Sequence, residues 1–408
     1  MALDVRSLDA HTCLKVYERT GTPCFVLFPE ILRRLTDLVG SARRLNSRLH
    51  LAYPIKTMPL AYWLRAWRIL GRYVEASSEC ELQLALKCGF STERIIVSGP
   101  GKSAWMESQR LRNISVVFDS VAEAQILGAV ALRSDWRVGL RFAPKRQVDP
   151  DNPAHPDQFG IDASDWRRAL GVLRGLGVKV AMLQFHLGGW QGDSKDRLRT
   201  LQELADLARH GRLEPEVVDV GGGLPQAYRA QDALSTARRA AANLRRLERE
   251  TRRLFPSCRE VVAECGRVIL GPTAVLLLRV VDVKVKYGAR FIICDGGRVN
   301  HAIPSDWEKH EVYFPNSARD IPRAEATVCG PTCMAWDFIA RAPIPVDVKP
   351  GHFVVYDAAG AYHWSWQSCF SQRRAAVATV RKLSRGGLRV RRLIATQEAK
   401  DWLALSGA

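Results

Sequence analysis

A repeating alternation of short apolar segments and longer amphipathic segments constrains the fold of this chain more than any other feature. The apolar segments have the length of buried strands, and the segments between them have helical periodicity. We expect strands at 22–28, 49–55, 72–76, 95–97, 116–118, 138–142, 180–185, 217–220 and 261–264. We expect helices at 31–41, 58–70, 80–87, 122–131, 165–176, 195–210 and 230–254. Strands that alternate with helices are typically parallel, and about eight such units close a barrel.

The pattern changes after Gly271. The stretch VLLLRVVDVKVKYGARFIICDGG is typical of strand, turn and strand, without a helix that could cover a parallel sheet. Further β-like segments follow at 327–329, 352–356 and 374–381. We therefore predict an α/β fold with a (β/α)8 TIM-type barrel over 28–270. A second, mostly antiparallel β domain is expected from 1–27 together with 271–408, as a sandwich or a small barrel.

Composition narrows the classes of function. The 408 residues are 47% hydrophobic, but no apolar run is long enough to span a bilayer, and MALDVRSLDAHTC lacks the order of a signal peptide. We therefore expect a cytoplasmic protein without membrane partners. The ten cysteines lack CxxC spacing, so we expect reduced thiols and no metal site.

The net charge of +18 raises the question of a nucleic-acid partner. The arginines of ARRAAANLRRLERETRRLF, at 237–255, alternate with glutamates and apolar residues. This pattern is typical of an amphipathic helix with a solvated basic face. No nucleic-acid-binding motif is present, and we expect no nucleic-acid partner.

Two features follow strands of the predicted barrel. LAYPIKTMPL, at 51–60, puts Lys56 at the end of an apolar strand, and DVGGGLP, at 219–225, puts three glycines after another. A buried cation needs a partner or a chemical use, and successive glycines let backbone N–H groups bind an anion such as phosphate. Because the carboxyl ends of barrel strands share one face, the two features suggest pyridoxal phosphate (PLP), held as a Schiff base on Lys56. As alternatives, Lys56 could be a lysine whose head reaches solvent, and the glycines could only permit a tight turn.

Eight motifs in a fixed order extend this interpretation over nearly the whole chain. They are TGTPCFVLFPEIL (20–32), AYPIKTMP (52–59), VEASSECELQLALKCGFSTERIIVSGPGKS (74–103), FHLGG (185–189), DVGGGLP (219–225), ECGR (264–267), CGPTC (329–333) and GAY (360–362). In these motifs the sequence resembles the fold-type III PLP-dependent decarboxylases, which include the diaminopimelate, ornithine and biosynthetic arginine decarboxylases. The resemblance implies a carboxy-lyase with an alanine racemase/decarboxylase-like fold.

The resemblance also implies roles for individual residues. Lys56 matches the lysine that carries the cofactor, and Glu264 matches the acid that pairs with its pyridine nitrogen. His186 matches the histidine that stacks on the cofactor ring. A helix-capping glutamate and a buried structural histidine are the alternatives for Glu264 and His186.

Phosphate binding is expected from Gly221, Gly222 and Gly223, with Arg267 and Tyr362 as side-chain donors. Two positions depart from the family's pattern. Gly189 stands where the family usually has a serine, which removes one hydroxyl contact to phosphate, and Cys265 replaces a proline.

Cys333 matches a cysteine that returns a proton to the carbanionic carbon, from the partner subunit of a homodimer with shared active sites. Asp337 follows at the family's spacing and is expected to orient this loop at the substrate side of the site. An inert buried cysteine is the alternative for Cys333.

The substrate-binding positions depart most from the family. Relatives that act on diamines or diaminopimelate have an acid directly after the cysteine, where this chain has Met334. Diaminopimelate enzymes also carry an arginine and a tyrosine around a proline, where HAIPSDWEKH, at 301–310, offers Ile303 and Trp307. A distal ammonium would lose its charge-assisted partner here, so we expect a larger, less cationic or conjugated amino acid.

Specialised biosynthesis, for example of a siderophore-like product, is expected by analogy only, as is a carrier-bound or peptide-like substrate. A PLP-dependent racemase or epimerase, diaminopimelate decarboxylase itself and an inactive regulatory homologue remain open.

Overall fold

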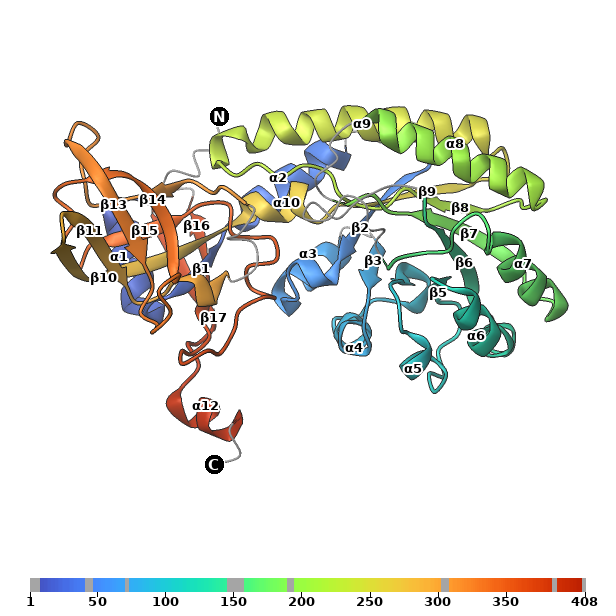
Figure 1. Ribbon diagram of the computed structural model, residues 1–408, viewed down its shortest axis with the longest axis horizontal. Coiled ribbons are helices and arrows are strands. Elements are labelled where there is room, and N and C mark those ends of the chain that lie inside the picture. The colour runs from blue at the N-terminus through green and yellow to red at the C-terminus, as the bar shows by residue number, and fades with distance from the viewer. Residues whose placement is uncertain are drawn as a thin grey trace. The chain divides into compact units, whose positions relative to one another are not determined.

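The computed structural model describes residues 8–40, 47–69, 73–144, 158–188, 194–301, 308–383 and 387–405. The chain divides into two compact units (Figure 1). The barrel unit comprises Leu38–Pro225 and Arg238–Gly266. The β unit comprises Met1–Asp37, Gln226–Ala237 and Arg267–Ala408. The domain limits expected from the sequence stay a prediction.

The barrel unit contains the eight-stranded parallel barrel that the sequence predicts. Its strands are β2 (Leu49–Pro54), β3 (Tyr73–Ala76), β4 (Ile95–Val97), β5 (Ser115–Phe118), β6 (Arg137–Phe142), β7 (Val180–Phe185), β8 (Val217–Asp219) and β9 (Glu260–Glu264). Pairing of β2 with β9 closes the ring, with Ala52 opposite Glu264. Each strand was expected within two residues of its observed bounds, and the predicted fold class is confirmed.

Helices follow the strands on the outside of this barrel (Figure 1). They are α3 (Ala61–Ile69), α4 (Glu79–Lys87), α5 (Ser103–Met106), α6 (Val121–Arg133), α7 (Trp166–Gly175), α8 (Ser194–His210) and α9 (Ala233–Leu254). Two of them begin at serine caps, because Ser78 accepts from the Glu81 N–H and Ser120 accepts from the Glu123 N–H. These caps fix the exit of the chain from β3 and β5.

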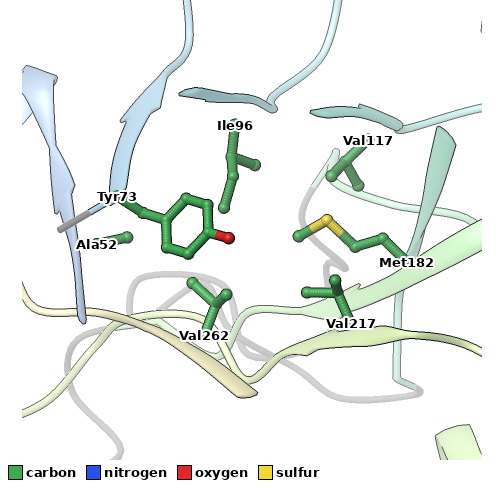
Figure 2. Packing of buried hydrophobic residues seen from close by; sticks show 7 residues of the cluster. All are labelled: Ala52, Tyr73, Ile96, Val117, Met182, Val217 and Val262. Atoms are coloured by element: carbon green, nitrogen blue, oxygen red, sulfur yellow. The ribbon is translucent and has the colours of Figure 1, made fainter. Parts of the chain in front are cut away.

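Side chains fill the interior of the barrel. One layer consists of Ala52, Tyr73, Ile96, Val117, Met182, Val217 and Val262, all buried (Figure 2). On β6 the corresponding space holds Gly139, where a Cβ would lie 3.1 Å from Val117 and 3.2 Å from Met182. Because apolar side chains pack the barrel, as in other barrels of this type, polar chemistry is confined to the strand ends.

The β unit contains a nine-stranded, mostly antiparallel sheet, as expected. Its strands are β1 (Cys24–Leu27), β10 (Ala274–Lys286), β11 (Ala289–Cys294), β12 (Val312–Tyr313), β13 (Arg323–Cys329), β14 (Phe338–Pro345), β15 (Phe353–Tyr356), β16 (Ala376–Lys382) and β17 (Leu388–Ile394). Among the described strands of the β unit, only β1–β16 and β11–β13 pair in parallel. The turn between β10 and β11 has positive φ at Tyr287 and Gly288, as two-residue hairpin turns require.

Helices α1 (Ala10–Thr20), α2 (Pro29–Gly40), α10 (Arg267–Leu270) and α12 (Ala399–Leu405) complete the described elements. Helix α1 was not predicted from the sequence, and its first turn is capped by Asp9, which accepts from the Thr12 N–H at 2.7 Å. Within the described ranges, no helix is long and apolar enough to cross a membrane.

Candidate active site

Lys56 lies in a short 3-10 turn, Ile55–Thr57, directly after β2. Its side chain is 39% exposed, and its Nζ donates to Glu75 Oε2 at 2.6 Å and to Ser77 Oγ at 3.0 Å. Glu75 is fully buried on β3 and also accepts from Ser77 and Ser98. The charge of Lys56 is therefore balanced by a buried carboxylate on the neighbouring strand, with its head still accessible.

Sequence reasoning assigned no role to Glu75. Glu75 could have been singled out from the sequence, because a lone acid within the apolar strand YVEA is as unusual as the lysine at the end of β2.

Two further buried carboxylates lie at neighbouring strand ends. Gln184 on β7 donates from Nε2 to Glu264 Oε1 at 2.9 Å and to Asp219 Oδ2 at 3.1 Å. Burial and the charge of Glu264 raise the pKa of Asp219 well above its ordinary value. Burial also acts against ionisation of Glu264, but contact with His186 and the charge of Lys56 outweigh it and lower the pKa of Glu264 to about 2. Glu264 is thus the ionised member of the pair.

His186 follows β7 and contacts both Glu264 and the glycine loop, defined as residues 221–223. Its Nδ1 lies 3.4 Å from Glu264 Oε2 and 3.1 Å from the nitrogen of Gly222. Nδ1 can accept from the Gly222 N–H only when it carries no proton, and it can donate to Glu264 only when it carries one. The His186 contact to Glu264 is therefore sensitive to a proton at Nδ1.

The glycine loop is tightly packed against the end of β7. Gly221 and Gly223 have positive φ values of 67° and 76°. A Cβ at Gly221 would overlap the carbonyl oxygen of Phe185, and a Cβ at Gly223 would overlap that of Leu187. Both backbone conformation and space therefore require glycine here, and the loop forms a cradle without side chains.

Arg197 lies behind this loop, in the first turn of α8, and was missed by the sequence analysis. Its side chain is 2% exposed, and its Nη1 donates to the carbonyl of Val220 at 3.4 Å. Burial lowers the pKa of Arg197 to about 10, against the charges of Cys265 and Glu264.

A sequence signal for Arg197 existed. The buried face of α8 includes Leu201, Leu204 and Ala208, and Arg197 occupies the position one turn before Leu201 on that face. An arginine on an otherwise apolar helix face is unusual, because arginine is almost never fully buried unless it is paired.

The β unit brings together the two expected phosphate donors, Arg267 and Tyr362. The Arg267 guanidinium lies 4.7 Å from the centroid of the Tyr362 ring, and its Nε donates to Glu308 at 3.1 Å. Gly360 is required nearby, because a Cβ there would overlap the carbonyl oxygen of Leu270.

The loop after β13 carries Cys333 and Met334. Asp337, which is buried, accepts from the Arg298 N–H at 2.7 Å and from the Thr332 N–H at 3.0 Å. The carboxylate of Asp337 is therefore occupied by the backbone of the β unit, which fixes the loop, whereas Cys333 is exposed and Met334 is half-buried. Ile303, Trp307 and Gly189 lie outside the described residues.

Comparison with known proteins decides the family. A family model described as "Pyridoxal-dependent decarboxylase, pyridoxal binding domain" matches residues 31–271, which is more than half of the chain. The chain belongs to the pyridoxal-dependent decarboxylase family. It is a PLP-dependent carboxy-lyase, as the sequence motifs predicted.

Individual relatives are distant but cover most of the decarboxylase. It is 24% identical to diaminopimelate decarboxylase of Aquifex aeolicus over 372 residues, or 87% of this chain and 86% of the other. It is 28% identical to diaminopimelate decarboxylase of Deinococcus radiodurans over 387 residues, or 90% and 92%. A crystal structure of diaminopimelate decarboxylase aligns with a TM-score of 0.84 at 20% identity, over 100% and 99% of the two chains. That structural likeness shows the fold.

The residues of the barrel unit fit PLP. The cradle at 221–223 leaves no room for a Cβ and is suited to an anion. Lys56 offers an amine for a carbonyl carbon, and Glu264 offers an ionised carboxylate for a protonated ring nitrogen. The donor set thus matches the aldehyde, the phosphate and the pyridine ring of this cofactor.

Proposed function

We propose that this decarboxylase removes the α-carboxyl group of an amino acid with PLP held on Lys56. The observation that carries the proposal is the pairing of an accessible strand-end lysine with buried Glu75, in a barrel whose neighbouring strand ends hold ionised Glu264 and the glycine cradle. When bound, the cofactor supplies an electron-withdrawing ring that stabilises the electron pair left on the α-carbon as carbon dioxide departs.

In this proposal Glu75 and Ser77 orient the Lys56 amine, and Glu75 accepts a proton from it. Glu75 Oε2 and Ser77 Oγ are the hydrogen-bond partners of Lys56 Nζ, at 2.6 and 3.0 Å. An amine attacks a carbonyl carbon only in its unprotonated form. A buried carboxylate at hydrogen-bond distance gives the displaced proton a place to go.

Glu264 holds a proton on the ring nitrogen of the cofactor, and Gln184 holds Glu264 in place. The low pKa of Glu264 supports its role at the ring nitrogen, because a carboxylate that stays ionised stabilises a neighbouring protonated nitrogen. His186 is assigned to the face of the cofactor ring, next to the glycine loop that binds the phosphate. Arg267 and Tyr362 are assigned as further phosphate donors.

Cys333 is assigned to protonation of the α-carbon in the active site of a partner subunit. The exposure of Cys333 and the fixing of its loop by Asp337 support a thiol presented to another chain. The decarboxylase is therefore proposed to be a homodimer with shared active sites. Asp337 contributes by orienting this loop rather than by contacting the substrate with its carboxylate.

For the substrate we propose a larger, less cationic or conjugated amino acid used in specialised biosynthesis. Met334 supports this, because it offers no charge to a distal ammonium. Ile303 and Trp307 are proposed to contact the substrate as well. A second candidate, diaminopimelate decarboxylation, is supported by the names of the relatives at 24% and 28% identity.

The test is a screen for carbon dioxide release. The purified holoenzyme is incubated with meso-diaminopimelate, ornithine, lysine, arginine and a panel of neutral, acylated and peptide-linked amino acids. We expect release from neutral or conjugated substrates and slow release from the diamino acids. Efficient turnover of diaminopimelate would favour the second candidate, and loss of chirality without carbon dioxide would indicate a racemase.

A further inference from the structure

The guanidinium of Arg197 lies against the glycine loop from the side of α8. Its Nη2 would lie 2.9 Å from a Cβ at Gly223, and its Nη1 contacts the carbonyl of Val220. Nη2 is buried and has no hydrogen-bond partner among the residues that the structure describes. One unpaired donor of a buried cation therefore lies next to the loop.

A buried cation without a paired anion is unfavourable. Removing a guanidinium from water costs several kcal/mol unless an opposite charge and full hydrogen bonding compensate. In the described part of the chain, no carboxylate lies within ion-pair distance of Arg197, and Glu264 acts on it only through its charge. Glu264 itself has other partners, Gln184 and His186.

We propose that Arg197 is the buried counter-charge for the phosphate of PLP, acting at the glycine loop from the side of α8. This inference rests on the proposed function, in which that loop holds the phosphate. The charge of Arg197 would then stabilise the bound phosphate from a buried position. Exposed arginines on α8 cannot do this as strongly, because water screens their charges.

The experiment compares PLP with pyridoxal, which lacks the phosphate. The cofactor is removed from the full-length enzyme, and the dissociation constant of each compound is measured by absorbance for wild type, Arg197→Gln and Arg197→Lys. The matched control is Arg199→Gln, since Arg199 lies on the same helix but is 66% exposed and paired with Asp196.

We expect Arg197→Gln to weaken PLP binding at least tenfold and to leave pyridoxal binding within twofold. Arg197→Lys should recover part of the loss, and Arg199→Gln should change neither constant. Without cofactor, Arg197→Gln should melt at the same temperature as wild type or higher, because an uncompensated buried charge has gone. A purely structural arginine would lower that melting temperature and weaken both compounds equally, which would overturn the proposal.

Gly223→Ala separates failure of this inference from failure of the proposed function. If it lowers the preference for PLP over pyridoxal and Arg197→Gln does not, the loop holds the phosphate without Arg197. If neither variant changes that preference, the phosphate is bound elsewhere, and both the inference and that part of the proposed function fail.

A second, independent observation concerns buried histidines of the β unit. His301, His310 and His363 lie together around Tyr356, and the rings of His301 and His310 both stack on it, at 4.5 and 4.8 Å between centroids. His363 meets His310 edge-on at 4.8 Å. Both ring nitrogens of His301 and His363 are buried without hydrogen-bond partners in the described ranges. Each such unsatisfied group costs about 1–3 kcal/mol.

Glu308 gives this cluster the arrangement of a metal site. Its Oε2 lies 2.8 Å from His310 Nε2 and 3.8 Å from His363 Nε2, and the ligand atoms of the three residues lie within 4.8 Å of one another. His310 Nδ1 lies 2.8 Å from the carbonyl oxygen of Asp357 and so donates to it. That bond holds the ring with Nε2 directed at Glu308, as in metal-binding histidines with a carbonyl in their outer shell.

We infer that Glu308, His310 and His363 bind a divalent transition metal ion of the zinc class. Two imidazole nitrogens and one carboxylate oxygen are a zinc ligand set. Arg267 donates to the other oxygen of Glu308, which orients the carboxylate from outside. The metal would satisfy one of the two unpartnered ring nitrogens of His363.

Metal content of the untagged holoenzyme as purified, and calorimetric zinc affinity after dialysis against a chelator, test this inference. The variants are His363→Gln and His310→Gln, with His210→Gln on exposed α8 as the control. We expect about one zinc ion per chain, an affinity at least 100-fold lower in both cluster variants and no change in the control. Zinc binding that persists in both variants, or no binding in wild type, would show that the cluster is a packed histidine group and not a metal site.

Discussion

The carboxyl ends of the barrel strands and the loop after β13 are built in opposite ways. At the barrel ends, Glu75 and Glu264 are buried; Glu75 accepts from Lys56, Ser77 and Ser98, and Glu264 contacts Gln184 and His186. In the loop, Cys333 is exposed and Met334 is half-buried, and Asp337 fixes the loop through its backbone. The first region sets protonation states by burial, and the second presents the Cys333 side chain to solvent.

This difference has a consequence for function. The chemistry of PLP needs charges in fixed positions. A change at Glu75 or Glu264 would disturb several hydrogen-bond partners at once. A side chain such as Met334 can be exchanged without breaking a buried network. We therefore expect the reaction type to depend on the barrel ends and the choice of substrate to depend on the loop.

The largest expected effect tests the barrel side of the comparison. Lys56→Ala should lower turnover by roughly 10²–10⁴-fold, the range for loss of a group that transfers protons or attacks in catalysis, and should abolish covalent attachment of PLP by borohydride. Peptide mapping after reduction checks the attachment site. Lys87→Ala, an exposed lysine on α4, is the control and should retain both. A cofactor still fixed to the chain in Lys56→Ala would contradict the assignment.

The next effect tests whether the loop serves a second chain. Lys56→Ala and Cys333→Ala should each be nearly inactive, and mixing them under subunit exchange should restore activity. With random pairing, about half of the dimers are mixed and one of their two sites is intact, so roughly a quarter of all sites should recover. Mass spectrometry of labelled chains verifies exchange. Absence of recovery despite exchange would place Cys333 in its own chain's site or outside catalysis.

A smaller effect tests the substrate side. Met334→Asp should lower the KM for ornithine and diaminopimelate by about tenfold, because a charge-assisted hydrogen bond contributes about 1.5–3 kcal/mol. Met334→Asn, of similar size without charge, is the control and should gain little. Equal gains in both variants would mean that charge at this position does not select the substrate. Steady-state carbon dioxide release gives the constants.

Predictability from sequence differs between the same two regions. Lys56 and the glycine loop were predicted because strand ends and glycine runs are visible in sequence, whereas His186 and Glu264 were assigned from the resemblance. Glu75 and Arg197 were missed because their significance depends on burial and on neighbours from distant segments. The positions that concern the substrate rest on resemblance alone, and two of them, Ile303 and Trp307, lie outside the described residues.

The fold shows the same division. The barrel strands were predicted because their apolar runs alternate regularly with helices. In the β unit, β14 and β17 were missed, since exposed residues alternate with partly buried ones along both strands and no continuous apolar run marks them. Helix α1 was missed because its hydrophobic face is short and its start depends on the cap at Asp9.

The smallest expected effect concerns Asp219, the proton-holding member of the buried carboxylate pair. Its pKa is raised by burial and by the charge of Glu264, so its contribution to stability is full below the unfolded-state pKa of about 4 and is lost as pH rises through the folded-state pKa. Asp219→Asn removes this loss and keeps an oxygen for the Gly221 N–H. The free energy of unfolding of the variant minus that of wild type should therefore increase as pH rises from 5 to 8, by at most about 1.4 kcal/mol per pH unit.

Urea unfolding of the cofactor-free chain at several pH values measures this difference. Asp162→Asn is the control, because Asp162 is exposed and hydrogen bonds from Ser164 lower its pKa. Asp162 is then ionised in both states above pH 5, so its replacement should give a difference that does not vary with pH in this range. A pH-independent difference for Asp219→Asn as well would mean that Asp219 and Glu264 are both ionised in the folded enzyme. The barrel ends would then hold two adjacent buried charges, and the contrast with the exposed loop would rest on hydrogen bonding alone.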